Sequence, residues 1–325
     1  SDLVLLNSNR NPGLSKAEGE VRVEDTGVSI NATSGQILNS QVRDVSVEIP
    51  HSNPGEVAHL HVDGDIDSNL VDGLKILQDS PIGATHTFAG WEGEGPLQGK
   101  LKLDIPLEHG QQPKVLVDFS TEQARLKLSE PPLELSQLNG TFRFDFDKGL
   151  SGQNITARAF DKPISAQIFA EGQPGQLQTR IAAKGQIALK ALTDWLKFTQ
   201  PLPASGEIPY QLQVSVGSRE NQLSIDSTLK GLKVDLPAPF GKAVSESRAT
   251  QFKMNLQGPQ QRFDVAYADV ARLAYAAPAG KLGQGRGELL LGNGTAQLPA
   301  GQGAAERRFA GEAAFERLAR VDVAG

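Results

Sequence analysis

Three side chains that bind metals in other proteins alternate in the stretch His59-Leu60-His61-Val62-Asp63. In a strand, residues i and i+2 point to the same face, so both imidazole rings would lie on one side. This spacing opens the His-x-His-x-Asp motif of two-metal hydrolases, whose metals activate water. Gly64 stands where a further histidine is required. We therefore predict a solvated strand face here, with no metal and no cofactor.

Oxygen-bearing side chains follow at the same two-residue spacing. Asp63, Asp65, Asp67 and Asn69 have the chemistry of a calcium-binding loop. Such a loop also needs a glycine and a terminal glutamate at set positions, and neither is in register in this chain. The sequence therefore favours an ordinary turn over a calcium site.

Two further motifs suggest catalysis or phosphate binding. Ser227-Thr228-Leu229-Lys230 matches the Ser-x-x-Lys pattern of penicillin-binding enzymes, but that pattern needs a helix and companion motifs that this sequence lacks. Gly283-Gln284-Gly285-Arg286-Gly287 is rich in glycine, yet a strand pattern follows where a phosphate site needs a helix N-terminus. No reaction is indicated, and we predict that the protein is not an enzyme.

The composition argues against several classes of function. The 325 residues carry a formal net charge of −6 and contain no cysteine, which disfavours nucleic-acid binding, disulfides and thiolate metal sites. No apolar run approaches the roughly 20 residues of a membrane helix. The chain starts at Ser1 and contains a single methionine, Met254. We expect an internal piece of a longer protein whose membrane anchor lies outside this chain.

The elements that position these residues are predicted to be strands. Apolar and polar residues alternate through most of the chain, as Val45 and Val47 do with Asp44 and Ser46, and turn signals separate the alternating runs. We predict a mainly β, antiparallel fold of about 18–20 strands with two or three short helices. Each strand then has one apolar and one polar side.

An internal repeat organises the chain. Residues 60–103 and 181–216 share a strand, a glycine turn, a short helix and a proline before the next strand. The pattern predicts the helices at about residues 69–78 and 189–199. The predicted domains are a first segment of residues 1–107, a second of residues 108–258, and the truncated start of a third at residues 259–325.

The second predicted helix carries one apolar stripe. A helix of two turns is marginal in water by itself, so we expect the stripe to dock on an apolar sheet face. Its members are Leu192, Trp195, Leu196 and Phe198.

The apolar sides of the strands are predicted to line one long, thin interior. Twenty strands at about 4.8 Å spacing would extend about 90 Å, and so long a sheet must curl or split. A strongly curved sheet would form an open hydrophobic groove, whereas two packed faces would form a filled core. Periodicity alone does not distinguish the two. The predicted lining residues are Val45, Val47, Leu101, Leu103, Phe142, Phe144, Phe146, Ile164, Ile168, Leu212, Val214, Leu223, Ile225, Phe252 and Met254.

The stretch Gly231-Leu232-Lys233-Val234-Asp235-Leu236-Pro237-Ala238-Pro239-Phe240-Gly241-Lys242 resembles a motif of the YhdP group. That group belongs to the AsmA-like, TamB-related family of Gram-negative envelope proteins. Residues 201–210, which end in Ile208-Pro209-Tyr210, resemble a strand start of the same group. The resemblance implies a U-shaped, β-taco-like groove that moves phospholipid through the periplasm between the inner and outer membranes. It also implies an inner-membrane anchor helix, absent here, on the whole protein.

The resemblance further implies two kinds of partner, phospholipid acyl chains and membrane components that contact parts of the protein outside this chain. Pro237 and Pro239 prevent regular ladder pairing, so they predict an edge loop with Phe240 tucked inward. This loop would blunt a sheet edge or form the groove rim. The alternative function is a structural or interaction module, a β-sandwich or solenoid stalk with a filled core.

Overall fold

The computed structural model describes residues 15–25, 27–37, 40–79, 90–108, 110–129, 132–173, 176–198, 200–218, 221–279, 281, 284–292, 294–298 and 307–311. Within these residues the chain forms nineteen strands and two helices, which confirms the predicted mainly β fold with short helices. The chain divides into two compact units, Ser1–Thr179 and Arg180–Gly325. The predicted segment boundaries near residues 107 and 258 remain predictions.

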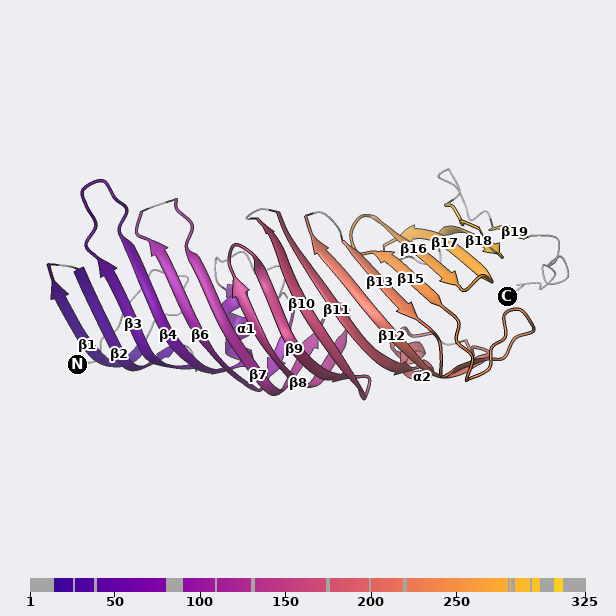
Figure 1. Ribbon diagram of the computed structural model, residues 1–325, viewed down its shortest axis with the longest axis horizontal. Coiled ribbons are helices and arrows are strands. Elements are labelled where there is room, and N and C mark those ends of the chain that lie inside the picture. The colour runs from indigo at the N-terminus through magenta and orange to yellow at the C-terminus, as the bar shows by residue number, and fades with distance from the viewer. Residues whose placement is uncertain are drawn as a thin grey trace. The chain divides into compact units, whose positions relative to one another are not determined.

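The first unit is a run of antiparallel strands that follow one another in sequence order (Figure 1). β4 pairs with β6, while the short β5 pairs with β7. Helix α1 (Leu70–Asp79) follows β4 directly. The strands are β1 (Ser15–Glu24), β2 (Gly27–Ile37), β3 (Ser40–Pro50), β4 (His59–Asn69), β5 (Glu92–Glu94), β6 (Pro96–Pro106), β7 (Lys114–Leu128), β8 (Leu133–Asp145), β9 (Gly149–Ala159) and β10 (Lys162–Gln173).

The second unit continues with antiparallel pairs from β12 to β18. β14 pairs with the start of β12, and β18 and β19 form a parallel pair, which departs from the predicted antiparallel order. Helix α2 (Leu189–Trp195) follows β11, the strand in which the division between the units falls. The strands are β11 (Gln176–Ala188), β12 (Ala204–Gly217), β13 (Gln222–Ser227), β14 (Leu232–Val234), β15 (Thr250–Asn255), β16 (Gln260–Tyr267), β17 (Ala271–Pro278), β18 (Arg286–Leu291) and β19 (Arg307–Gly311).

Both copies of the repeat place a helix directly after a strand. The glycine turn predicted before each helix is wrong, because Gly64 and Gly185 lie inside β4 and β11. The missing side chain of Gly64 makes room for Val45 of β3, whose Cγ2 would lie 3.3 Å from a Cβ at position 64. Glycine thus serves packing between strands at this position.

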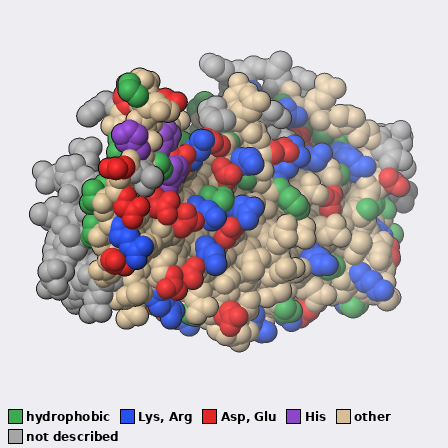
Figure 2. All heavy atoms as spheres, turned by 60° about the vertical axis from the view of Figure 1, so that its left-hand side comes forward, with side chains coloured by type: hydrophobic (Ala, Val, Ile, Leu, Met, Phe, Trp, Pro, Cys, Tyr) green, Lys and Arg blue, Asp and Glu red, His purple; other side chains and the backbone are tan. Residues whose placement is uncertain are grey.

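One face of the first unit carries charges that alternate from strand to strand. Lys100 Nζ lies 3.6 Å from Asp65, and the Arg143 guanidinium donates hydrogen bonds of 2.6 and 2.9 Å to Asp118. Figure 2 shows acidic and basic side chains interspersed over this side of the molecule, beside a group of histidines. A one-residue slip would move these charges to the apolar face, so they favour the observed register. The residues in register are Arg43, Asp65, Lys100, Asp118 and Arg143.

The opposite face of the first unit is apolar and partly filled. Phe119 and Phe142 stack with ring centroids 5.1 Å apart. Gly152 makes room for the Phe142 ring, because a Cβ at this position would lie 2.9 Å from Phe142 Cδ1. The buried side chains form three clusters: Leu70, Leu97, Ala124, Leu138, Ile155 and Ala157; Leu74, Val115 and Phe144; Ala32 and Val45.

Replacing Arg143 by glutamine tests the charged row. The hydrogen bonds from Arg143 hold the pKa of Asp118 below its ordinary value. We expect Arg143→Gln to raise that pKa back toward the ordinary value of an aspartate in a carboxyl NMR titration. The pKa of Asp104 is the internal control and should not move, because it is lowered mainly by a hydrogen bond from His59.

The same substitution should change stability only slightly. A carboxyl whose folded-state pKa is depressed stabilises the fold above the unfolded-state pKa, and this contribution is lost as the pH falls through the folded-state pKa. The side chains of Arg143 and Asp118 are 58% and 45% exposed. Solvent therefore screens the pair, and we expect Arg143→Gln to lower the free energy of unfolding only slightly at neutral pH. A larger loss would mean that the pair organises the sheet itself.

Candidate functional site

The histidine pair lies on the charged face of the first unit. His59 Nδ1 lies 2.5 Å from Asp104 Oδ1, and His61 Nδ1 lies 3.7 Å from the same oxygen. Lys114 Nζ lies 4.0 Å from the second oxygen of Asp104. The hydrogen bond with His59 is the main reason why the pKa of Asp104 is lowered. Among the residues that the structure describes, no three His, Cys, Asp or Glu side chains are grouped to hold a metal ion.

The aspartates that follow these histidines lie in strand β4, so the predicted turn is wrong. Asp63 lies 3.5 Å from Lys102 Nζ on β6, and Asp67 lies 2.5 Å from the Arg43 guanidinium on β3. Each carboxylate therefore faces a cation from a neighbouring strand. The two-residue spacing that suggested a calcium loop is the spacing of one strand face.

The Ser-x-x-Lys motif spans the end of β13 instead of a helix. Ser227 Oγ donates a hydrogen bond to the carbonyl of Pro209 at 2.6 Å and accepts one from the Leu229 amide at 2.9 Å. The hydroxyl is used to end a strand. In the glycine-rich motif Gly283 lies outside the described residues, and β18 begins at Arg286.

In the first unit, α1 covers part of the predicted lining. Leu70 and Leu74 of α1 are 7% and 9% exposed and pack in the first two clusters. Phe144 lies in the second cluster and is 6% exposed, so this side chain belongs to a filled core. Leu101 is half-buried. The remaining predicted residues of this unit belong to or pack against the three clusters: Val45, Val47, Leu103, Phe142, Phe146, Ile164 and Ile168.

In the second unit, apolar side chains form two rows that cross the sheet. Neighbouring members are paired residue to residue across the strands. Every member is half-buried, neither enclosed nor freely exposed. The Val214 row contains Val214, Leu223, Met254, Phe263 and Tyr275; the Leu212 row contains Leu212, Ile225, Phe252, Val265, Leu273 and Leu289.

Helix α2 does not cover these rows as α1 covers the first unit. No residue of α2 is buried. Leu196 and Phe198, which follow its last turn, are 59% and 48% exposed. Leu192 and Trp195, the other members of the predicted stripe, are half-buried, and α2 packs beside β12. The predicted docking of the apolar stripe is therefore wrong for Leu196 and Phe198 only.

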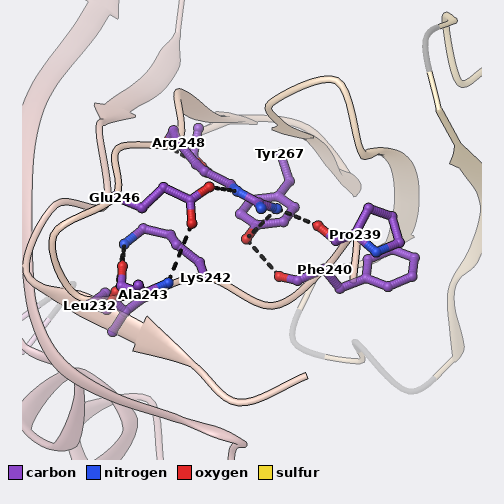
Figure 3. Close-up of polar contacts among 9 residues, drawn as sticks. Leu232, Pro239, Phe240, Lys242, Ala243, Glu246, Arg248 and Tyr267 are labelled. Carbon is purple, nitrogen blue, oxygen red and sulfur yellow. Dashed lines mark hydrogen bonds and ion pairs between the residues drawn. The ribbon is translucent and has the colours of Figure 1, made fainter. Parts of the chain in front are cut away.

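The loop after β14 is held by the buried side chain of Lys242. This residue is 4% exposed, and its Nζ donates hydrogen bonds to the carbonyl oxygens of Leu232 at 2.6 Å and Ala243 at 2.8 Å (Figure 3). Burial lowers the pKa of Lys242, because loss of water disfavours the charged form. The two carbonyl oxygens replace that water and fix the base of the loop.

Arg248 and Tyr267 hold the tip of the loop (Figure 3). The Tyr267 hydroxyl donates a hydrogen bond of 2.9 Å to the carbonyl of Phe240. The Arg248 guanidinium lies over the Tyr267 ring, 5.5 Å from its centroid, and donates to the carbonyl of Pro239. Arg248 Nε also donates to Glu246 at 2.9 Å, which is the main cause of the lowered pKa of Glu246.

This loop lies alongside the Leu212 row, on the side away from the Val214 row. Tyr267 pairs with Thr250, two residues along the strands from the pair of Phe252 and Val265. Pro237 is exposed, whereas Pro239 and Phe240 are half-buried. The structure therefore brings the predicted rim residues and the second-unit lining together within one unit.

Across residues 11–309 the chain matches the family model described as YhdP protein. The chain belongs to the YhdP family. The resemblance seen in the loop motif and the strand start is thereby confirmed, and membership of this family indicates a role in lipid transport in the cell envelope. No match to the chain is found among curated proteins or among solved structures. In the described part of the chain, neither helix has the length and apolar character needed to cross a bilayer.

For this YhdP-family chain, the predicted lining covers only part of the two rows. All six lining residues predicted in the second unit belong to them. Phe263 and Val265 were missed, although they alternate with polar residues and this alternation predicts that they share one strand face. Leu273, Tyr275 and Leu289 were harder to predict, because the alanines and glycines around them conceal the alternation.

Replacing Tyr267 by phenylalanine tests how the loop is held. The change removes the hydroxyl that binds the Phe240 carbonyl. We expect amide hydrogen exchange in residues 237–242 to become about fivefold faster, since a hydrogen bond contributes about 1 kcal/mol net. Tyr210→Phe, on β12 of the same unit, is the matched control. Equal exchange in the two variants would show that Tyr267 does not hold the loop.

Proposed function

We propose that this chain is a non-enzymatic segment of a phospholipid transporter that shields acyl chains across the periplasm, between the inner and outer membranes. The observation that carries the proposal is the pair of half-buried apolar rows in the second unit, which α2 leaves uncovered. Membership of the YhdP family supports the same function. The transport would maintain the lipid supply of the outer membrane and its permeability barrier.

The physical argument concerns the hydrocarbon tail. An acyl chain gains about 0.8 kcal/mol for each CH₂ group removed from water, so a lipid that crosses an aqueous space needs continuous apolar cover. A groove open on one side covers the tail and leaves the charged head group in water, which avoids the cost of burying a charge. Rows of similar aliphatic and aromatic side chains offer neighbouring positions of similar energy. The tail can then slide along a passive path.

We assign the lining of this groove to the predicted lining residues of the second unit and to the rest of the two rows. The loop with Pro237, Pro239 and Phe240 forms the groove rim in this proposal, because Tyr267 and Arg248 hold it alongside the Leu212 row. The remaining partners are membrane components that contact other parts of the protein, which an inner-membrane helix outside this chain would anchor.

The three buried clusters of the first unit favour a second candidate function. Clusters of this kind are typical of a β-sandwich or a solenoid stalk with a filled core. In that case the protein would be a structural or interaction module, and purified chain would carry no lipid.

Two neighbouring substitutions on β12 distinguish these functions. Val214 belongs to an apolar row, whereas Gln213 is exposed on the opposite face. We expect the parent chain to co-purify with phospholipid in native mass spectrometry, and Val214→Asp to reduce the bound lipid at least tenfold, because a charge would sit against the acyl chain.

Gln213→Asp introduces the same charge on the polar face and should keep the bound lipid unchanged. A parent chain without phospholipid, or equal lipid loss in both variants, would contradict the transport function. Circular dichroism of all three proteins separates loss of binding from loss of folding.

A further inference from the structure

We propose that the two copies of the repeated helix have different roles: α1 permanently covers part of the apolar face of the first unit, and the acyl chain binds the two rows of the second unit that α2 leaves uncovered. α1 has Gly73 at its contact with the sheet, whereas α2 contains no glycine. The inference rests on the proposed function and restricts where its lipid is held.

Close packing seats α1 on its sheet. A Cβ at Gly93 of β5 would lie 2.6 Å from Leu70 Cδ2 and 2.9 Å from Leu74 Cδ1. A Cβ at Gly73 would lie 2.9 Å from Leu97 Cδ1 on β6. All three distances are shorter than carbon atoms tolerate, so a Cβ at either position would push these leucine side chains aside. Glycine at both positions lets the helix lie against the sheet without that shift.

Polar contacts fix the start of α1. The Leu70 amide donates a hydrogen bond of 2.9 Å to the carbonyl of Gly95, and the Asp72 amide donates one of 2.9 Å to Asn69 Oδ1. Asp72 is only 3% exposed. These contacts satisfy amides that the first turn of a helix leaves without an intrahelical partner. The helix is therefore tied to the sheet at its N-terminus as well as along its apolar side.

The second copy differs at each of these points. In sequence, Leu70-Val71-Asp72-Gly73-Leu74-Lys75 aligns with Leu192-Thr193-Asp194-Trp195-Leu196-Lys197, so Trp195 matches Gly73. The matching leucines, Leu196 and Leu74, are 59% and 9% exposed. The side chain of Asp194, which matches buried Asp72, is 63% exposed and pairs with Lys190. α2 contains no glycine at which it could approach a sheet as α1 does at Gly73, and none of its residues is buried.

The uncovered rows fit a hydrocarbon chain in both chemistry and length. Apart from the hydroxyl of Tyr275, their side chains offer no hydrogen-bonding group. The Leu212 row crosses from β12 to β18. Five inter-strand steps of about 4.8 Å make it about 24 Å long, which exceeds the roughly 15 Å that one acyl chain spans in half a bilayer.

A phosphatidylethanolamine with a diazirine in its acyl chain tests this assignment without altering the protein. After irradiation of the complex with the full chain, peptide mass spectrometry locates the adducts. We expect them in residues 210–225, 250–267 and 271–291. Residues 114–119 and 142–146, which lie in or beside the clusters that α1 completes, should carry at least fivefold fewer adducts.

Gly73→Trp copies the second repeat into the first, and Val71→Trp is its matched control because Val71 is 53% exposed on the same helix. We expect Gly73→Trp to raise the adducts in residues 114–119 and 142–146 at least fivefold, and Val71→Trp to leave the map unchanged. Leu74→Ala opens the same cluster without added bulk and should raise the adducts near Phe144, even if Gly73→Trp does not fold.

The outcomes separate this inference from the proposed function. Equal adduct density in both units of the parent chain would overturn the role of α1 and leave lipid transport standing. No adduct anywhere, or a lipid-free dimer in native mass spectrometry, would overturn both. Adducts confined to the second unit that spread on Gly73→Trp would support both.

Discussion

The structure depends on the two-residue period of its strands. Because neighbouring side chains point to opposite faces, each strand pairing sets a charged row and an apolar row together. Asp65 and Lys100 face each other on one side of the β4–β6 pair, and Val62 and Leu103 face each other on the other. A change of register would expose the apolar row and bury the charges at once, so the two faces stabilise the same pairing.

An apolar face must then be covered by protein, by a partner or by a ligand. In the first unit the chain supplies a cover itself, through the leucines of α1 and the glycines that let them approach. The apolar rows of the second unit stay half-buried, and Leu196 and Phe198 at the end of the second copy are exposed. Two copies of one sequence pattern therefore give a partly covered face and a more open face. An open apolar face suits a YhdP-family protein with a role in envelope lipid transport.

The loop after β14 shows how the same sheet handles an irregular segment. Its prolines cannot pair as a strand, and its carbonyl groups instead accept hydrogen bonds from Lys242, Arg248 and Tyr267. Buried cations are costly unless hydrogen-bonded, and here the backbone supplies the acceptors. The loop is thus held alongside the Leu212 row, which suits a rim better than a mobile lid.

The sequence by itself determined the mainly β class, the two short helices, the family and the side of each strand on which Phe252 or Val214 lies. These features are local, because periodicity, prolines and a motif act within a few residues. Only the tertiary structure decided that Phe144 is enclosed, that Leu196 and Phe198 are exposed and that Gly64 lies within a strand. Those outcomes depend on what packs against each face from elsewhere in the chain. A two-residue period determines on which face of the sheet a side chain lies, but not what packs against that face.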